Sequence, residues 1–376
     1  LRLMFLKFRY RLGYESLCRE VSDSITWRRF CRIPLDGSMP HPTTLMKLTT
    51  RCGSAAVDGL NEALLAKAAE AKLLRTNRVR ADTTVVPANV AYPTDSGLLA
   101  KAVRRIAATS QRIQAAGGAV RTRVRDRSRA AGKRAHAVAS KLRSRAALGR
   151  DEATAAVLKS TGELARLAET AARDAQRLLV NAKRAVRLAK AKAVEQGAHD
   201  PVEGRRRGRL ARAVNDLANL LEATERIIGQ ARQRIAGMIP DGASRVVSLH
   251  DRDARPIAKG RLGKPVEFGY KAQVVDNDDG IVLDHDVHAG NPADAPQLAP
   301  AIQRVKDRAG RAPGTVAADR GYGEAAVDRA LTELGVRNIV IPRKGKAGLA
   351  RQQLERRRAF RRTVKWRTGC EGRIST

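Results

Sequence analysis

The sequence predicts an α/β domain built on a mixed sheet with flanking helices, interrupted by a long α-helical insertion and preceded by an all-α domain. Runs rich in β-branched residues, which are typical of strands, occur near 78–86 and again only after residue 240. The stretch between them is almost entirely Ala, Arg, Leu, Lys and Glu, which are helix formers. We therefore expect four segments, of which the second and fourth form one sheet: 1–76, 77–97, 98–240 and 241–376.

The N-terminal segment is expected to be a small helical domain for DNA binding or dimerisation. Apolar residues over 14–30 recur at helical spacing, and the Pro- and Gly-containing stretch 33–44 predicts a loop. Thr43 or Thr44 is expected to cap a helix over 45–52, which is followed by a longer one over 55–74. Short helices joined by a tight loop are typical of a helix-turn-helix in a major groove, and plain helical packing or dimerisation explains them as well.

The first strand of the predicted sheet, Val79 to Val86, carries Asp82 in its middle, and Pro87 and Pro93 prevent its extension. A carboxylate inside a β-branched run needs a partner, because burying it unpaired is costly. Asp82 therefore either lies on a solvated or salt-bridged face or holds a cation.

The insertion is the most basic part of the chain. Residues 101–150 contain 15 Lys and Arg but a single acid, Asp126. After residue 151 acids return, and apolar residues recur every three or four positions, which predicts an antiparallel coiled coil or helical hairpin. Turns are expected at Gly117-Gly118 and at Gly204 with Arg205 to Arg207. The insertion is either an arm that grips DNA phosphates or a solvated helical spacer.

The last segment is expected to complete the sheet. Asp319 ends a predicted strand before a glycine loop, and Gly335 is the expected C-terminal cap of the next helix. The predicted order is three strands (245–249, 267–275 and 281–290), helix 292–309, strand 314–318, helix 324–334, strand 337–342, and a basic helix from 349 to 371.

The charge balance points to a polyanion as partner. The chain has 73 Lys and Arg against 38 Asp and Glu, a net charge of +35, so nucleic acid is the first candidate and an anionic membrane a weaker one. No apolar run approaches the ~20 residues of a membrane span, and the N-terminus is too basic for a signal peptide. Four separated cysteines without a C-x-x-C indicate reduced cytosolic thiols, neither a disulfide frame nor a zinc site. No P-loop or dinucleotide fingerprint supports a nucleotide cofactor. Leu1 suggests an unusual start codon or a truncated beginning.

Three distant carboxylates could form one metal site. Asp82 on a first strand, Asp319 at a later strand end and Glu371 on a terminal helix could hold two Mg²⁺ or Mn²⁺ ions, which suit phosphoryl displacement. Arg367 lies one turn before Glu371, so it either orients Glu371, meets a phosphate or forms a surface ion pair. Lys271 and Arg320 are further candidates for DNA contact, although a solvated face also explains Lys271.

Two competing metal sites are weaker. Asp284, Asp286 and His288 share one face of a strand, which is either a metal site or a wet sheet edge. Asp276, Asp278 and Asp279 resemble a calcium loop only loosely, because the required glutamate is missing.

Several motifs, in the same order, resemble the DDE transposases of bacterial insertion sequences. They are ADTTVVPANVAYPTDSGLL (Ala81 to Leu99), EFGYK, HAGNPADAPQL, VAADRGYG and RTGCEGRIS, together with SDSITWRRFCRIPL and PHPTTL near the start. The closest likeness is to the branch with an N-terminal helical domain and a ribonuclease H-like core. This resemblance implies the catalytic triad Asp82, Asp319 and Glu371, divalent-metal-dependent cleavage and strand transfer, binding to terminal inverted repeats and target DNA, a homo-oligomeric active complex, and a place in the bacterial cytoplasm at the nucleoid.

The resemblance has departures. The family signature continues as Tyr, Arg, Glu and Lys, but Val364 stands at the Tyr position and the Lys would lie beyond Thr376. We therefore expect a catalytic helix cut one turn after its glutamate. The insertion also follows the first Asp strand, whereas related cores usually carry theirs between the second Asp and the Glu. The alternatives are a catalytically inactive, truncated relic and an architectural DNA-binding protein based on the insertion.

Overall fold

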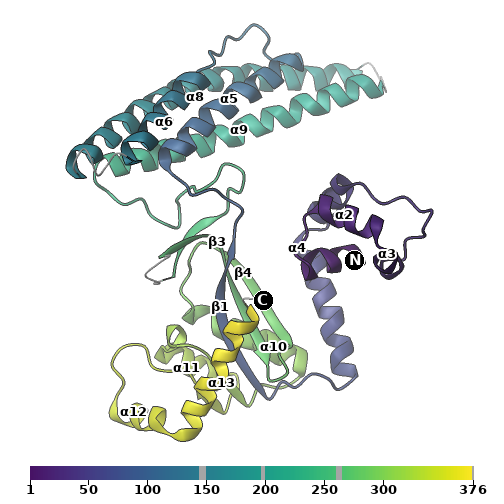
Figure 1. The fold of residues 1–376 in the computed structure, drawn as a ribbon, viewed down its shortest axis with the longest axis vertical. Helices are drawn as coiled ribbons and strands as arrows, with labels where there is room; N and C mark the ends of the chain where they lie inside the picture. The colour runs from purple at the N-terminus through teal and green to yellow at the C-terminus, as the bar shows by residue number, and fades with distance from the viewer. Residues whose placement is uncertain (144–149, 196–199, 260–264, 375–376) are drawn as a thin grey trace. The chain divides into compact units, whose positions relative to one another are not determined.

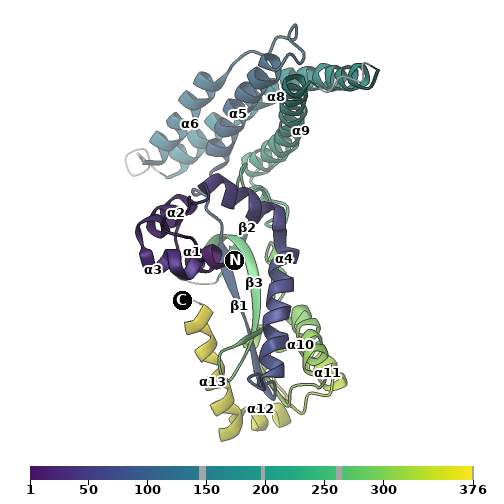
Figure 2. The same cartoon turned by 90° about the vertical axis from the view of Figure 1, so that its right-hand side faces the viewer.

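The computed structural model describes residues 1–143, 150–195, 200–259 and 265–374, except for the side chains of 150, 192–195 and 370–374. The chain divides into two compact units. One contains residues 1–76 and 306–311, and the other contains 77–305 and 312–376. Figure 1 shows the helices and strands of each unit along the chain, and Figure 2 shows them from the side.

The N-terminal unit is helical, as predicted, but its helices divide differently. It consists of α1 (Arg2–Arg9), α2 (Tyr14–Asp23), α3 (Ile25–Cys31) and α4 (Pro42–Glu70). The single helix expected over 14–30 is broken at Ser24, whose Oγ accepts from the Trp27 amide at 3.2 Å and caps α3. The two helices expected after residue 44 are one helix, kinked at Gly53 where φ is +65°. Its cap is His41, whose Nδ1 accepts from the Thr43 amide, rather than a threonine.

A mixed sheet organises the second unit and confirms the predicted fold class. Its strands are β1 (Arg78–Pro87), β2 (Arg255–Ala258), β3 (Val266–Asn277), β4 (Val282–Ala289), β5 (Thr315–Ala317) and β6 (Asn338–Val340). The order is β2-β3-β1-β5-β6, with β4 also paired to β3. β1, β5 and β6 run parallel, whereas β2, β3 and β4 pair antiparallel. β1 is therefore an interior strand, and Pro87 is its last residue.

The prediction of a strand over 245–249 is wrong. The Gln230 side chain accepts from the Val246 amide and donates to the Val246 carbonyl, both at 3.1 Å, and so replaces the bonds of a neighbouring strand. Val246 and Leu249 are buried in the core of the helical insertion. Both apolar side chains contribute to helix packing, and the strand forms instead at Arg255–Ala258.

Helices cover both faces of the sheet. They are α10 (Ala295–Ala309), the 3₁₀ turn η1 (Arg320–Tyr322), α11 (Ala325–Glu333), α12 (Leu349–Arg356) and α13 (Arg358–Ile374). α13 packs against β1, and Phe360 lies in one apolar cluster with Ala317 of β5 and Val340 of β6. The basic helix expected from residue 349 is thus two helices, because the chain leaves helical geometry at Arg357 (φ −60°, ψ 138°).

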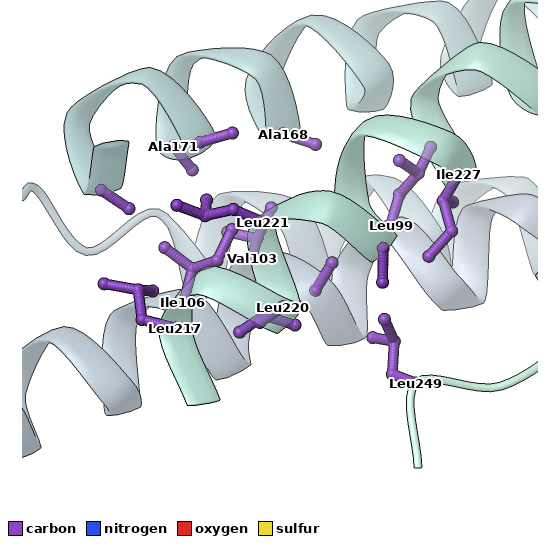
Figure 3. Close-up of a cluster of buried hydrophobic side chains, with 14 of the residues drawn as sticks. Leu99, Val103, Ile106, Ala168, Ala171, Leu217, Leu220, Leu221, Ile227 and Leu249 are labelled. Atoms are coloured by element: carbon purple, nitrogen blue, oxygen red, sulfur yellow. The ribbon is translucent and has the colours of Figure 1, made fainter. Parts of the chain in front are cut away.

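The insertion packs as a bundle of α5 (Asp95–Ala115), α6 (Ser128–Arg143), α8 (Arg150–Glu195) and α9 (Pro201–Ile235). Figure 3 shows its core, where leucine and isoleucine side chains of α5 and α9 meet alanines of α8. The predicted turn at Gly117-Gly118 follows α5, but the turn predicted at Gly204 is wrong. Gly204 lies inside α9, since Asp200 caps that helix and Pro201 begins it.

Candidate active site

Asp82 lies on β1, and Asp319 follows the end of the neighbouring parallel strand β5 by two residues. In the register of β1 and β5, Arg80 is opposite Ala317. Asp82 and Asp319 each follow two residues later, Asp82 within β1 and Asp319 beyond the end of β5. Paired strands lie ~4.8 Å apart. The register therefore brings the end of β5 next to β1, and the charges of Asp82 and Asp319 both act on the buried hydroxyl of Tyr322.

Asp82 is buried and bound on both oxygens. Its Oδ2 accepts from Nη1 of Arg367 at 3.0 Å, and its Oδ1 accepts from the Thr83 amide at 2.9 Å. Asp82 is 7% exposed and Arg367 is 9% exposed. The sequence left two environments open for Asp82, a solvated or salt-bridged face and a site that holds a cation. The structure shows the salt bridge, and its partner is Arg367, 285 residues away in the sequence.

Asp319 is held by the glycine loop that follows it. Its Oδ1 accepts from the Gly321 amide at 2.7 Å and so caps η1. Gly323 closes the loop, where any side chain would place its Cβ 2.0 Å from the Pro342 carbonyl oxygen. Asp319 is half-buried, and Arg320 beside it is exposed. The loop thereby fixes one carboxylate oxygen of Asp319 and leaves the exposed guanidinium group of Arg320 next to the site.

Two arginines of β1 hold α13 in place. The guanidinium carbons of Arg78 and Arg80 lie 4.2 Å and 4.7 Å from the centre of the Trp366 ring. Arg80 also donates from Nη1 to the Trp366 carbonyl at 2.7 Å. Because Arg367 is the next residue, these contacts set it over Asp82.

Glu371 lies on α13, one turn beyond Arg367, but its side chain is outside the part that the structure describes. The backbone therefore puts Glu371 on the helix face that carries Arg367. Val364, at the Tyr position of the family signature, packs against the apolar cluster beneath α13. The catalytic roles of Asp82, Asp319 and Glu371 remain predictions.

Lys271 forms an ion pair with Asp294, which lies near Asp319 at the glycine loop. In the register of β1 and β3, Lys271 is opposite Val85. Its Nζ lies 2.7 Å from Oδ1 of Asp294 and donates to the Pro292 carbonyl at 2.8 Å. Its side chain is 12% exposed, so the solvated face considered for Lys271 is wrong.

Tyr322 and Asp294 join the site, although the sequence analysis did not single them out. Burial, followed by the charges of Asp294, Asp82 and Asp319, raises the pKa of the Tyr322 hydroxyl. A Cβ on Gly321 would lie within 3.0 Å of both Asp319 Oδ1 and Asp294 Oδ2. The charges of three carboxylates thus act on one buried phenol. In the sequence, Asp294 and Tyr322 were marked only by their places in the HAGNPADAPQL and VAADRGYG motifs.

This raised pKa makes folding sensitive to alkaline pH. A tyrosine whose pKa is raised in the folded state keeps its proton there after the unfolded chain has lost it, so stability is full below about pH 10 and falls as pH rises above it. We expect Tyr322→Phe to remove up to about 1.4 kcal/mol per pH unit of that slope. Urea unfolding between about pH 9 and pH 11 measures it. The exposed Tyr92→Phe is the control, and equal slopes for both variants would contradict the assignment.

The competing metal sites are occupied by arginines. Arg304 of α10 donates to both oxygens of Asp284, at 2.9 and 2.7 Å, so the Asp284, Asp286 and His288 face is a salt-bridged one. Asp276 accepts from Arg80 at 2.7 and 2.8 Å, and Asp278 accepts from Arg78 at 2.8 Å. The carboxylates of the β3–β4 hairpin thus neutralise the arginines of β1.

The donors at the Asp82 site suit a hard divalent cation. Carboxylate oxygens are the ligands that Mg²⁺ prefers, and few are needed because the ion keeps several waters. Among the side chains that the structure describes, no three of His, Cys, Asp or Glu are placed to hold a metal ion. Asp82 and Asp319 are two of the three predicted ligands, and the side chain of the third, Glu371, lies outside that part.

Comparison with known families gives two matches. Residues 241–374 match the family described as Transposase DDE domain, and residues 1–51 match the family described as Transposase domain (DUF772). The two matches indicate an insertion-sequence DDE transposase. A search of curated proteins and a search of solved structures each gave no match.

The matched ranges cover only part of the candidate site. Asp319, Arg367 and Glu371 lie within the DDE domain, which implies a ribonuclease H-like fold for the transposase core. Asp82 and the helical insertion lie outside both matches, so their place in the transposase rests on the sheet register and the contacts above. In the described part of the chain no helix is long and apolar enough to cross a membrane. Cys18, Cys31 and Cys52 are free thiols, and the Cys370 side chain lies outside the described residues.

Proposed function

We propose that this transposase binds the ends of its element as double-stranded DNA and catalyses metal-dependent strand cleavage and strand transfer. The observation that supports this most is that Asp82 lies on β1 and Asp319 follows β5, the strand paired in parallel with β1, next to a helix held by Trp366. Phosphoryl transfer requires little covalent chemistry from the protein, so positioned charges suffice.

Asp82, Asp319 and Glu371 would hold the divalent ions, Mg²⁺ or Mn²⁺. When bound, a pair of such ions activates the attacking oxygen and stabilises the leaving oxygen of an in-line displacement. The chain's own contribution is to hold the carboxylates. The Thr83 amide fixes Asp82 and the Gly321 amide fixes Asp319, which keeps both ligands oriented before DNA arrives.

Arg367 has a positioning role in this proposal. Its guanidinium balances the charge of Asp82 within the buried site and joins α13 to β1, which sets the turn that carries Glu371. Arg320, exposed beside Asp319, is the nearest candidate for contact with a DNA phosphate.

The remaining segments complete the proposal. Residues 1–76 form the DNA-binding or dimerisation domain, the two parts of the sheet (77–97 and 241–376) form the catalytic core, and 98–240 is an insertion between them. The net charge of +35 supports DNA as the partner. Cleavage of two element ends and their joining to target DNA requires a homo-oligomer in the active complex.

The test is an assay on the element's own ends. Purified protein is expected to nick a duplex carrying the terminal inverted repeat, found in the DNA that flanks the gene, when Mg²⁺ or Mn²⁺ is present. A scrambled duplex and an EDTA-treated reaction are the controls. Binding without any cleavage under both metals would overturn the catalytic proposal in favour of a DNA-binding relic.

A further inference from the structure

The linker between α5 and α6 carries arginines at alternate positions. Its sequence over 119–127 is AVRTRVRDR, so Arg121, Arg123, Arg125 and Arg127 are two residues apart. The chain turns at Ala119, whose carbonyl accepts from the Thr122 amide at 2.9 Å, and then runs to α6 without helix or strand (Figure 1). In an extended chain, side chains two residues apart point to the same side.

The residues between these arginines attach the linker to the bundle. Gln114 of α5 donates to the Thr122 carbonyl at 2.8 Å, and Asn181 of α8 donates to the Thr122 hydroxyl at 2.9 Å. Val124 packs against the bundle core. At the end of the linker, Arg127 donates to Asp174 of α8 at 2.6 Å. The linker is therefore held to the bundle along its length.

These attachments leave three arginines facing outward. Arg121, Arg123 and Arg125 are exposed, and among the residues that the structure describes their side chains have no carboxylate partner. The nearby acids are engaged elsewhere. Asp126 accepts from the Ser128 amide at 2.8 Å, and Asp174 is shared by Arg127 and Arg177. Outward arginines without partners cost free energy through mutual repulsion unless an anion faces them.

We propose that Arg121, Arg123 and Arg125, here called the arginine strip, bind consecutive stretches of one DNA strand's phosphate backbone. Each arginine of the strip is exposed while Thr122 and Val124 between them are partly buried, so the three long side chains lie on the outer side of the linker, where they can reach successive phosphates of one strand. Guanidinium groups pair with phosphates through two parallel hydrogen bonds. The strip carries no base-reading geometry, so it binds DNA of any sequence and orients the bundle along a duplex.

This proposal rests on the proposed action on DNA and adds a second contact, which the insertion supplies independently of the metal site. The test replaces all three arginines together by glutamine, in the full chain, and measures binding to a random-sequence duplex across a salt series. Each phosphate contact contributes about 0.9 to the slope of log affinity against log salt, so we expect the slope to fall by about 2 to 3 and affinity to fall at least tenfold at moderate salt.

The matched control removes the same charge elsewhere on the bundle. Lys159, Arg166 and Arg209 are exposed on α8 and α9, and their triple glutamine variant is expected to change the slope by less than half as much. Equal decreases of the salt slope in the two variants would overturn the proposal for the arginine strip, because they would show an effect of net charge alone. Circular dichroism establishes that both variants are folded.

A cleavage assay keeps this proposal separate from the function proposed above. At low salt and saturating repeat-end DNA, the strip variant is expected to cleave like the parent, because it leaves Asp82 and Asp319 untouched. If the parent itself fails to cleave, the catalytic proposal falls while the salt slopes still decide the strip. A strip variant that binds normally at all salt concentrations would contradict the inference.

Discussion

Asp82→Asn and Asp319→Asn are each expected to lower Mg²⁺-dependent cleavage of a repeat-end duplex by at least about 10³-fold, because losing a metal ligand costs several kcal/mol of transition-state stabilisation. Both substitutions keep the size of the side chain and its bonds to the Thr83 or Gly321 amide. Duplex affinity is expected to remain within about twofold, since most of it comes from phosphate contacts elsewhere.

The matched control is Asp286→Asn. Asp286 is a carboxylate on β4 of the same sheet, 42% exposed in its side chain, and it lies outside the proposed ligand set. The Asp286→Asn variant is expected to cleave the repeat-end duplex like the parent. Should Asp82→Asn retain parental cleavage with normal folding, the triad assignment would be wrong, whatever the fate of Asp319→Asn.

Arg80→Met is expected to lower the free energy of unfolding by about 3–5 kcal/mol, because it strands the buried carboxylate of Asp276 without its cation. Arg80 and Asp276 are each 2% exposed and joined by two hydrogen bonds. The same variant removes the bond to the Trp366 carbonyl and the ring contact, so α13 is also expected to loosen. Urea unfolding measures the first effect, and the cleavage assay reports the second.

A double variant separates the two effects. Arg80→Met with Asp276→Leu removes both charges, and buried ion pairs replaced by apolar side chains of similar size are often no less stable. We expect it to regain most of the lost stability but to cleave more slowly than the parent, because Trp366 is still released. The exposed pair Arg112 and Asp216 is the control, and breaking it is expected to cost less than about 1 kcal/mol. If Arg80→Met were as stable as the variant that breaks the Arg112–Asp216 pair, the stabilising role of the Arg80–Asp276 ion pair would be disproved.

The local sequence was sufficient for elements whose pattern agrees with their surroundings. The strands predicted over 267–275 and 281–290 are present as β3 and β4, and the helical insertion was predicted from its composition. The prediction of a strand over 245–249 was wrong because the side chain of Gln230 forms the hydrogen bonds of the Val246 backbone. Gln230 lies too far from Val246 in the sequence for a local pattern to reveal this contact. The turn predicted at Gly204 failed because the stronger signal lay three residues earlier, at Pro201 after the capping Asp200.

The sequence by itself determined the chemistry available to this chain: an acid within a β-branched run, another at a strand end, a third on a basic helix, and an excess of arginine. Tertiary structure decided which charges meet. The register of β1 and β5 brings the strand of Asp82 next to the strand that Asp319 follows, and α13 directs Arg367 to Asp82, whereas the sequence alone pairs Arg367 with Glu371 on one helix face. It also directed Lys271 to Asp294. The reason is physical, because residue spacing fixes the face of an element, but only strand pairing and helix packing determine what lies against that face.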